Sequence, residues 1–417
     1  MTRTLIIAIS LEITVSVFLY GKSLAAAPAT KNKGPPALFA FGDSMLDTGN
    51  NNDLLTALKC NFRPYGRDFM GGKPTGRFCN GRVPSDFLAE LLGLKKYLPA
   101  YLDKGLKTED LLTGVGFASG ATGYDPLTSQ IAVIHYSFAL SLSLRTNSYL
   151  TGKPFTFLGP LDGTSLSSAI SRAHISDEIL LFYFFVIIQS VISMPNQLNL
   201  FKQYKRNITA AVGQKQAAKI VAQSTYVMIA GNNDIANTYF STPFRRVHYD
   251  VPSYTDLLID HASSFFMDLY GQGSRKIAVL SMPPIGCVPS QRTLDGGLRR
   301  ECSERANEAA LLFNSKLSPK LKDLSKQLPG SRFVYMDVYN TLLDIFQNHT
   351  KYGFEVGNKG CCGTGNIEAS ILCNRLQDTA TCKDDTKYVF WDSLHLTERA
   401  YEILSNETFN KYKNQLL

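Results

Sequence analysis

Short apolar runs that end at a glycine or in a polar turn alternate with helix-like segments along most of this chain. We expect buried strands at 37–41, 115–118, 224–230, 276–280 and 332–337. We expect helices at 85–92, 197–212, 214–223, 254–270 and 301–327, and a further one capped by the polar run 50–53. Strands that alternate with helices are joined in parallel, so this order predicts an α/β fold with a mostly parallel sheet and helices on both faces.

Length and composition set wider limits on the fold. The 417 residues correspond to two or three domains of about 150 residues, although an α/β fold can also form one large domain. Hydrophobic residues make up 44% and charged residues 19%, which excludes a disordered chain, a collagen and a coiled coil. The net charge of +8 comes without long basic runs, which fits anionic surroundings such as a cell wall and argues against a dedicated nucleic-acid binder.

The N-terminus has the three parts of a secretory signal. Arg3 precedes apolar stretches at 5–9 and 13–20, and three alanines at 25–27 form a small-residue exit. We therefore expect a signal peptide at 1–27 and a linker at 28–36, the alternative being a buried or anchoring helix. The protein is then expected to be secreted and extracellular.

Cysteines and sequons agree with an oxidising compartment. The eight cysteines could form four disulfides, for which 105 pairings are possible. Cys361 and Cys362 are adjacent and the histidines are scattered, so we expect no metal site. Asn207, Asn348 and Asn406 head Asn-x-Thr sequons and are candidate glycosylation sites.

Polar turns follow three of the expected strands, at 42–44, 119–120 and 231–234, and a fourth polar segment lies at 391–395. Carboxyl ends of parallel strands form the functional edge of such sheets. A serine needs a base to become a nucleophile, and histidine is the best base near neutral pH. These segments offer Ser44 as a nucleophile, His395 as a base and Asp392 as a carboxylate suited to orient the histidine.

An oxyanion formed at an ester carbonyl needs hydrogen-bond donors, which the backbone N–H of Gly120 and the side chain of Asn233 could supply. Each residue also has a structural alternative. Asn233 and Asp392 could be helix caps, and Gly120 could serve a tight turn. His395 alone could be a surface or core residue. Their joint occurrence in order favours catalysis.

Four blocks resemble those of the plant GDSL esterase/lipase family, within the SGNH hydrolases. They are FGDSMLDTGNNN at 41–52, GVGFASGATGYD at 114–125, GNND at 231–234 and FWDSLHLTE at 390–398. Similarity covers most of 37–405, and the segments KCN at 59–61 and GCCGTG at 360–365 resemble the extracellular lipase subgroup known from pollen coats. Met45 and Leu396 depart from the family's usual Leu and Pro.

The resemblance implies a three-layer α/β/α sandwich of flavodoxin-like character, formed by one domain at 37–417. It implies the triad Ser44, Asp392 and His395, and an oxyanion hole made by Gly120, Asn233 and the backbone N–H of Ser44. No cofactor is implied. The expected activity is hydrolysis of lipid esters or acylated wall components by a secreted monomer that binds no nucleic acid and has no stable membrane span. The alternatives are an acyltransferase with the same triad, and a catalytically inactive wall- or lipid-binding protein.

The family pattern is interrupted once. The sequence before 133 would continue naturally at 190, and 57 residues, 133–189, intervene. Val133 has codons that start with GT and Gln189 can be encoded by CAG, the usual ends of an intron. We therefore interpret 133–189 as a possible retained intron. The alternative is a genuine insertion, such as an apolar lid over the site.

Overall fold

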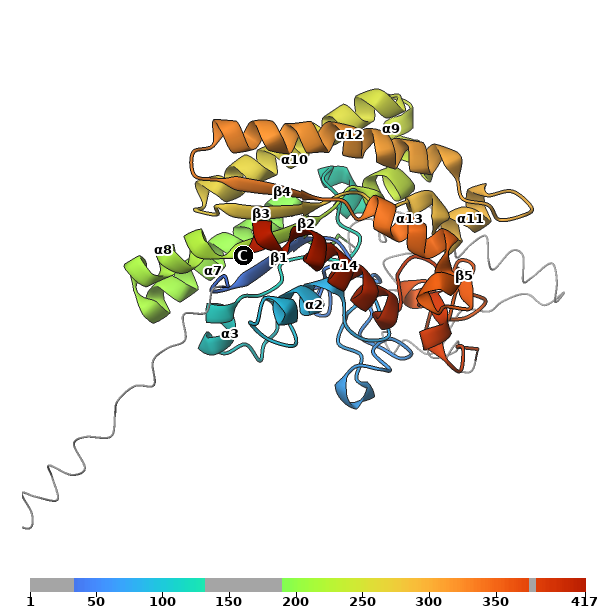
Figure 1. Ribbon diagram of the computed structural model, residues 1–417, viewed down its shortest axis with the longest axis horizontal. Coiled ribbons are helices and arrows are strands. Elements are labelled where there is room, and N and C mark those ends of the chain that lie inside the picture. The colour runs from blue at the N-terminus through green and yellow to red at the C-terminus, as the bar shows by residue number, and fades with distance from the viewer. Residues whose placement is uncertain (1–33, 132–189, 375–379) are drawn as a thin grey trace, which may run out of the picture. The chain divides into compact units, whose positions relative to one another are not determined.

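Four parallel strands form the central sheet in the order β1-β2-β3-β4 (Figure 1). The computed structural model describes residues 34–131, 190–374 and 380–417. The strands are β1 (Leu38–Gly42), β2 (Thr225–Ile229), β3 (Lys276–Leu280) and β4 (Arg332–Met336). Gly42 is in register with Ile229. The turns that follow β1 and β2 therefore leave the sheet side by side at its carboxyl edge.

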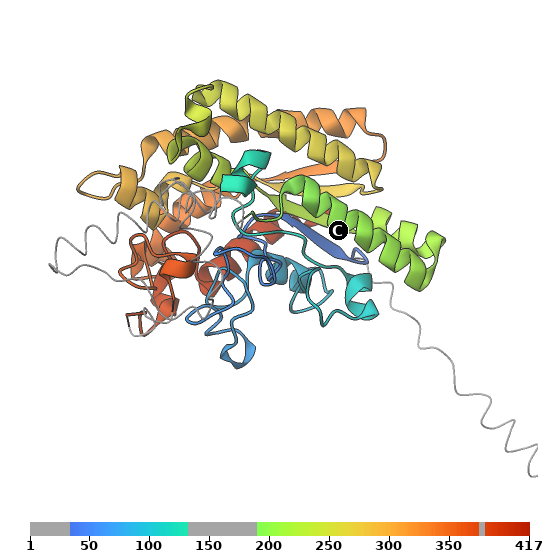
Figure 2. The same ribbon diagram turned by 180° about the vertical axis from the view of Figure 1, so that it is seen from behind.

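Helices cover both faces of this sheet (Figures 1 and 2). One face carries α7 (Met194–Val212), α8 (Gln214–Gln223), α10 (Val251–Gly271) and α12 (Glu304–Gln327). The other face carries α2 (Pro84–Leu91), α13 (Tyr339–Gln347) and α14 (Glu398–Leu416). The three-layer α/β/α sandwich expected from the sequence is confirmed.

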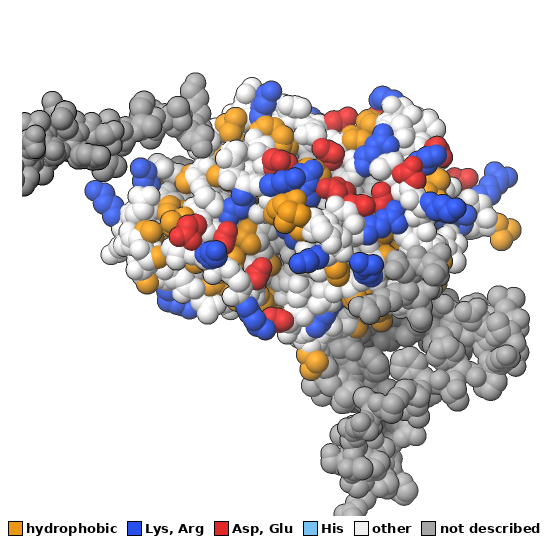
Figure 3. Space-filling view, turned by 90° about the horizontal axis from the view of Figure 1, so that it is seen from below, with side chains coloured by type: hydrophobic (Ala, Val, Ile, Leu, Met, Phe, Trp, Pro, Cys, Tyr) orange, Lys and Arg blue, Asp and Glu red, His pale blue; other side chains and the backbone are white. Residues whose placement is uncertain are grey.

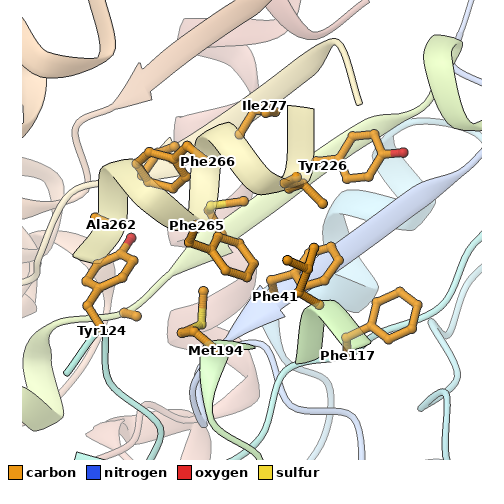
Figure 4. Close-up of a cluster of buried hydrophobic side chains, with 14 of the residues drawn as sticks. Phe41, Phe117, Tyr124, Met194, Tyr226, Ala262, Phe265, Phe266 and Ile277 are labelled. Atoms are coloured by element: carbon orange, nitrogen blue, oxygen red, sulfur yellow. The ribbon is translucent and has the colours of Figure 1, made fainter. Parts of the chain in front are cut away.

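Alternate strand residues face opposite layers, as the two-residue period of a strand requires. Phe39 and Phe41 of β1 join a cluster with α7, α10 and α12, part of which is drawn in Figure 4. Leu38 and Ala40 join a second cluster with α2, α13 and α14. Because both faces are covered, the strands are mostly apolar, which explains why the sequence shows continuous rather than alternating apolar runs.

Shorter elements connect these layers. They are α3 (Thr108–Thr113), α9 (Pro243–Arg246), α11 (Pro289–Asp295), a π-helical segment η2 (Asp234–Phe240), and 3-10 turns at Met70–Gly72, Ile285–Cys287, His349–Tyr352, Ser370–Leu372 and Asp385–Lys387. A separate two-stranded sheet pairs β5 (Val356–Gly360) with β6 (Tyr388–Phe390). The described residues between Pro35 and Leu417 form one compact unit.

Two expected elements are absent. The run 115–118 makes only isolated bridges, through Gly116, to Ala40 and Ala100. No helix follows 50–53. There, the side chains of Asn50 and Asn51 donate instead to backbone carbonyls, among them Gly116, Ala118 and Gly120. These asparagines tie two loops together and cap no helix.

Three disulfides form among the eight cysteines: Cys287–Cys302, Cys361–Cys382 and Cys362–Cys373. Cys60 and Cys79 are buried free thiols, so the fourth possible bridge is not made. Basic and acidic side chains are interspersed over the face drawn in Figure 3. Among the helices that the structure describes, none combines the length and apolarity needed to cross a bilayer. The expected signal peptide 1–27 and the segment 133–189 lie outside the described residues.

Candidate active site

The nucleophile candidate lies on the turn that ends β1. Gly42 has φ 121°, and a side chain there would meet the carbonyl oxygen of Ile229 at 1.8 Å, so only glycine fits. The Asp43 N–H donates to that same carbonyl (3.2 Å), and Asp43 Oδ1 accepts from the N–H of Met45 (2.9 Å). The strand end and the side chain of Asp43 therefore hold Ser44 at the carboxyl edge of the sheet.

A glutamine from α7 holds the end of β1 through the backbone of Gly42. Gln197 Oε1 accepts from the Gly42 N–H (2.9 Å), and Gln197 Nε2 donates to the Gly42 carbonyl (2.8 Å). The side chain has no exposed surface. Gln197 pairs with Gly42 as a neighbouring strand would, and so anchors the turn that carries Ser44.

Ser44, His395 and Asp392 form a continuous hydrogen-bonded chain. His395 Nε2 lies 2.8 Å from Ser44 Oγ. His395 Nδ1 lies 2.8 Å from Asp392 Oδ2 and 3.0 Å from Oδ1. Ser44 and His395 are 7% and 6% exposed, and Asp392 is fully buried. The sequence separates Ser44 and His395 by 351 positions, and the fold brings them into contact.

The loop that carries Asp392 and His395 is internally braced. Asp392 Oδ1 accepts from the N–H groups of Leu394 (2.8 Å) and His395 (2.7 Å). Directly after the loop, Thr397 caps α14 through the N–H of Ala400. This cap starts the helix at a defined residue and limits movement of the loop.

A buried aspartate connects the nucleophile turn to the second block. Asp47 Oδ1 accepts from the N–H groups of Gly49 and Asn50 (2.8 Å each), and Oδ2 accepts from the Gly120 N–H (2.9 Å). Burial raises the pKa of Asp47 to about 6. The Gly120 N–H, expected to face an oxyanion, therefore points at Asp47 in this structure.

Asn233 lies where β2 passes into η2, a π-helical segment of the kind often found at functional sites. Its Nδ2 donates to the Thr122 carbonyl (3.0 Å), and its Oδ1 accepts from Asn237 Nδ2 (3.1 Å). Asn233 is partly exposed, and one of its two amide hydrogens is left for another acceptor. Within the described residues, no group accepts from the backbone N–H of Ser44 or of Ala121.

Asp43 and Asp234 support the site without joining the hydrogen-bonded chain of Ser44, His395 and Asp392. Burial raises the pKa of Asp43 to about 7, and the hydrogen bond from Met45 opposes this. Burial, followed by the charge of Asp125, raises the pKa of Asp234 to about 8. Asp234 accepts from the N–H groups of Tyr124 (2.8 Å) and Asp125 (3.1 Å), and so holds the second block against η2.

Sequence reasoning missed Tyr65, Asp47, Gln197 and Phe78. The Tyr65 hydroxyl donates to Asp392 Oδ2 (2.6 Å), and the Phe78 ring centroid lies 5.2 Å from that of His395. Tyr65 follows a proline in a Gly- and Pro-rich loop, and that context gives no sign of a partner 327 positions away. Over the described ranges, no group of three or more His, Cys, Asp or Glu side chains is placed to hold a metal ion.

The chain was compared with known proteins. The family model described as "GDSL-like Lipase/Acylhydrolase" matches residues 38–408. From Arabidopsis thaliana, GDSL esterase/lipase EXL3 is 44% identical over 403 residues, covering 97% of this chain and 94% of the relative. GDSL esterase/lipase EXL2 is 42% identical over 382 residues, covering 91% of this chain and 89% of the relative.

Proposed function

Because the chain belongs to the GDSL-like lipase/acylhydrolase family, we propose that it hydrolyses carboxylic esters through an acyl-enzyme formed on Ser44. Relatives named esterase/lipase place it among the carboxylic ester hydrolases. The observation that carries the assignment to Ser44 is the contact of 2.8 Å between Ser44 Oγ and His395 Nε2, with Asp392 behind the ring.

The reaction follows from this geometry. Ser44 Oγ attacks the ester carbonyl carbon while His395 Nε2 takes its proton, and Asp392 stabilises the imidazolium. Collapse of the tetrahedral intermediate breaks the bond to the alcohol oxygen, which leaves with the proton from His395. Water then attacks the acyl-enzyme by the same route and releases the acid and free Ser44.

The oxyanion needs donors that are ready before the reaction. The Ser44 N–H and the Asn233 side chain would supply two. Gly120, expected to supply a third, would have to share its N–H with Asp47, whereas the adjacent Ala121 N–H has no acceptor within the described residues. In the structure of an organophosphonate adduct, the contacts of the phosphonyl oxygen would identify whether the Gly120 or the Ala121 N–H donates to the oxyanion.

We propose that the enzyme is secreted, acts as a monomer, and uses lipid esters or acylated wall components. Three disulfides suit an oxidising compartment. Asn207, Asn348 and Asn406 are all exposed, as glycan acceptors must be. The intact contact between Ser44 and His395 favours an enzyme over an inactive binding protein. Product analysis with added alcohols would separate hydrolysis from acyl transfer.

We also propose that 133–189 is a retained intron. The described residues on its two sides bond directly to each other: the Val191 N–H donates to the Ser129 carbonyl (3.1 Å) and the Ile192 N–H to Ser119 Oγ (3.0 Å). The surrounding fold can thus close without the segment. Amplification of the transcript across this junction should yield a message that lacks these codons, and a message of full length alone would refute the proposal.

Hydrolysis of a short p-nitrophenyl ester tests the activity. We expect turnover that Ser44→Ala reduces by at least about 10⁴-fold, since removal of a triad nucleophile has this effect. The matched control is Ser405→Ala, because Ser405 is also buried and its hydroxyl has no partner within the described residues. Turnover that survives Ser44→Ala would place the nucleophile elsewhere.

A further inference from the structure

The carboxylate behind His395 has a partner from a distant loop. The Tyr65 hydroxyl donates to Asp392 Oδ2 over 2.6 Å, and the oxygen of Tyr65 accepts from the Ser370 N–H over 2.7 Å. Tyr65 and Asp392 are both fully buried. Because Ser370 occupies an acceptor position on the hydroxyl oxygen, the hydroxyl proton is directed at Asp392.

The ring of Tyr65 is held as firmly as its hydroxyl. Phe62 packs edge-on against it at a centroid distance of 5.8 Å, and Trp391 does so at 6.2 Å. Ser370 lies within the loop closed by the Cys362–Cys373 disulfide. Aromatic packing therefore fixes the ring of Tyr65. The donor to its hydroxyl oxygen, the Ser370 N–H, lies in a loop that a disulfide closes.

We propose that Tyr65 is a positioning residue that extends the chain Ser44–His395–Asp392 and weakens the attraction of Asp392 for a positively charged imidazole. The proposal rests on the triad assigned above. The other hydrogen bonds to Asp392 come from its own loop, through the N–H groups of Leu394 and His395 and the imidazole. Tyr65 is the donor that ties this carboxylate to the rest of the fold, within the part of the chain that the structure describes.

The direction of the effect follows from electrostatics. The hydroxyl points the positive end of its dipole at Asp392, and therefore toward the neighbouring imidazole. This opposes the positive charge that His395 gains when it is protonated, and it draws negative charge on Asp392 away from the ring. Removal of the hydroxyl should therefore stabilise the imidazolium.

Other titratable groups lie around Asp392 and His395 and could also affect the pH profile. Asp43 interacts electrostatically with His395, and three groups do so with Asp392, namely Cys60, Cys79 and Tyr401. Asp47 interacts with Asp43 and Cys60, and all five groups are fully buried. Burial raises the pKa of both thiols and of Tyr401 well above their ordinary values, so these groups stay neutral below pH 8. Burial raises the pKa of Asp43 to about 7 and of Asp47 to about 6, but both titrate in wild type and variant alike. A difference between the two proteins therefore reports on Tyr65.

The test is Tyr65→Phe in the full chain, with kcat, KM and the pH profile of kcat/KM measured on a short p-nitrophenyl ester. Because Asp392 loses the hydrogen bond that fixes its position, the imidazole should be less well aligned, and kcat should fall by about 10- to 100-fold with little change in KM. This loss of alignment should outweigh the gain from a more stable imidazolium. The acid limb of kcat/KM should move to higher pH. Tyr226→Phe is the matched control, because it removes an equally buried hydroxyl that donates to the Val221 carbonyl (2.8 Å) away from the triad. It should leave both readouts unchanged.

An acid limb that stays in place, or moves to lower pH, would overturn the proposal even if kcat falls. A merely structural role would lower kcat without moving the acid limb of kcat/KM to higher pH. If Tyr65→Phe does not fold, a ring-fluorinated tyrosine at position 65 gives the opposite test. It retains the ring and makes the hydroxyl a stronger donor, so the acid limb should move to lower pH, and an unmoved limb refutes the proposal. Activity that survives Ser44→Ala refutes the triad itself, which distinguishes the two failures.

Discussion

Replacement of Gln197 tests how the strand end holds the nucleophile. In Gln197→Ala, the Gly42 N–H loses the Gln197 oxygen, and no other described residue accepts from it. The Gly42 carbonyl keeps a donor in the Ser119 N–H (2.9 Å). The Ile192 carbonyl, which also accepts from Gln197 Nε2 (3.1 Å), keeps one in the Thr122 hydroxyl.

The free-energy cost follows from these partners. One buried N–H left unpaired costs about 1–3 kcal/mol, and each of the two other hydrogen bonds contributes about 0.5–1.5 kcal/mol, at the lower end because both carbonyls keep a donor. We therefore expect Gln197→Ala to reduce the free energy of unfolding by about 3 kcal/mol. The kcat should fall as well, because Ser44 follows Gly42 by two residues and relaxes with it.

Urea unfolding and kcat on a p-nitrophenyl ester measure these two effects. The matched control is Gln203→Ala, since Gln203 is exposed on the same helix. Its unfolding free energy should change by less than about 0.5 kcal/mol, the usual limit for a surface substitution. A loss below about 1 kcal/mol in Gln197→Ala, or an unchanged kcat, would refute the reasoning that Gln197 holds the turn.

Three further changes test other parts of the site. Asn233→Ala should lower kcat by about 100- to 1,000-fold, because it removes a proposed oxyanion donor. Replacement of Cys362 and Cys373 by serine should cost about 3 kcal/mol in urea unfolding, as the loop-closure relation gives for a separation of 11 residues, and should also lower kcat by releasing the loop that fixes Tyr65. Burial raises the pKa of Asp234 to about 8, so the folded state retains a proton that the unfolded chain releases near pH 3.8. The unfolding free energy of wild type should therefore fall, relative to Asp234→Asn, as the pH rises from 4 to 8.

Each of these changes has its own check. Asn237→Ala, which removes the amide behind Asn233, should lower kcat less than Asn233→Ala, and equal losses would argue against a direct role for Asn233. The Cys287–Cys302 pair, with a separation of 15 residues, should cost a similar free energy without loss of kcat. For Asp234, a difference from Asp234→Asn that is constant with pH would contradict the assigned direction.

The sheet could be predicted closely from sequence because buried parallel strands are continuous apolar runs. The prediction for 276–280 matches β3 at both ends, and that for 224–230 extends one residue beyond β2 on each side. The prediction at 115–118 was wrong. Gly114 lies so close to β1 that a side chain at this position would meet the Leu38 carbonyl oxygen at 2.0 Å. The segment after it passes close to β1 but pairs with it only through an isolated bridge.

The site could be predicted in part. The four blocks predicted the family and the ester hydrolase class, which the comparisons confirm. Tyr65, Asp47 and Gln197 could not be found in this way. Each acts through hydrogen bonds to partners that lie 73 to 327 positions away, and no local pattern encodes such contacts. The free thiols of Cys60 and Cys79 likewise depend on tertiary placement.

The central claim is that Ser44 is the nucleophile of an ester hydrolase. Labelling with an organophosphonate, followed by mass spectrometry of the peptide that contains Ser44, tests it most directly. We expect one adduct, on Ser44, that is lost in Ser44→Ala and reduced by competing ester. An adduct that persists in Ser44→Ala, or that maps to another residue, would contradict the account.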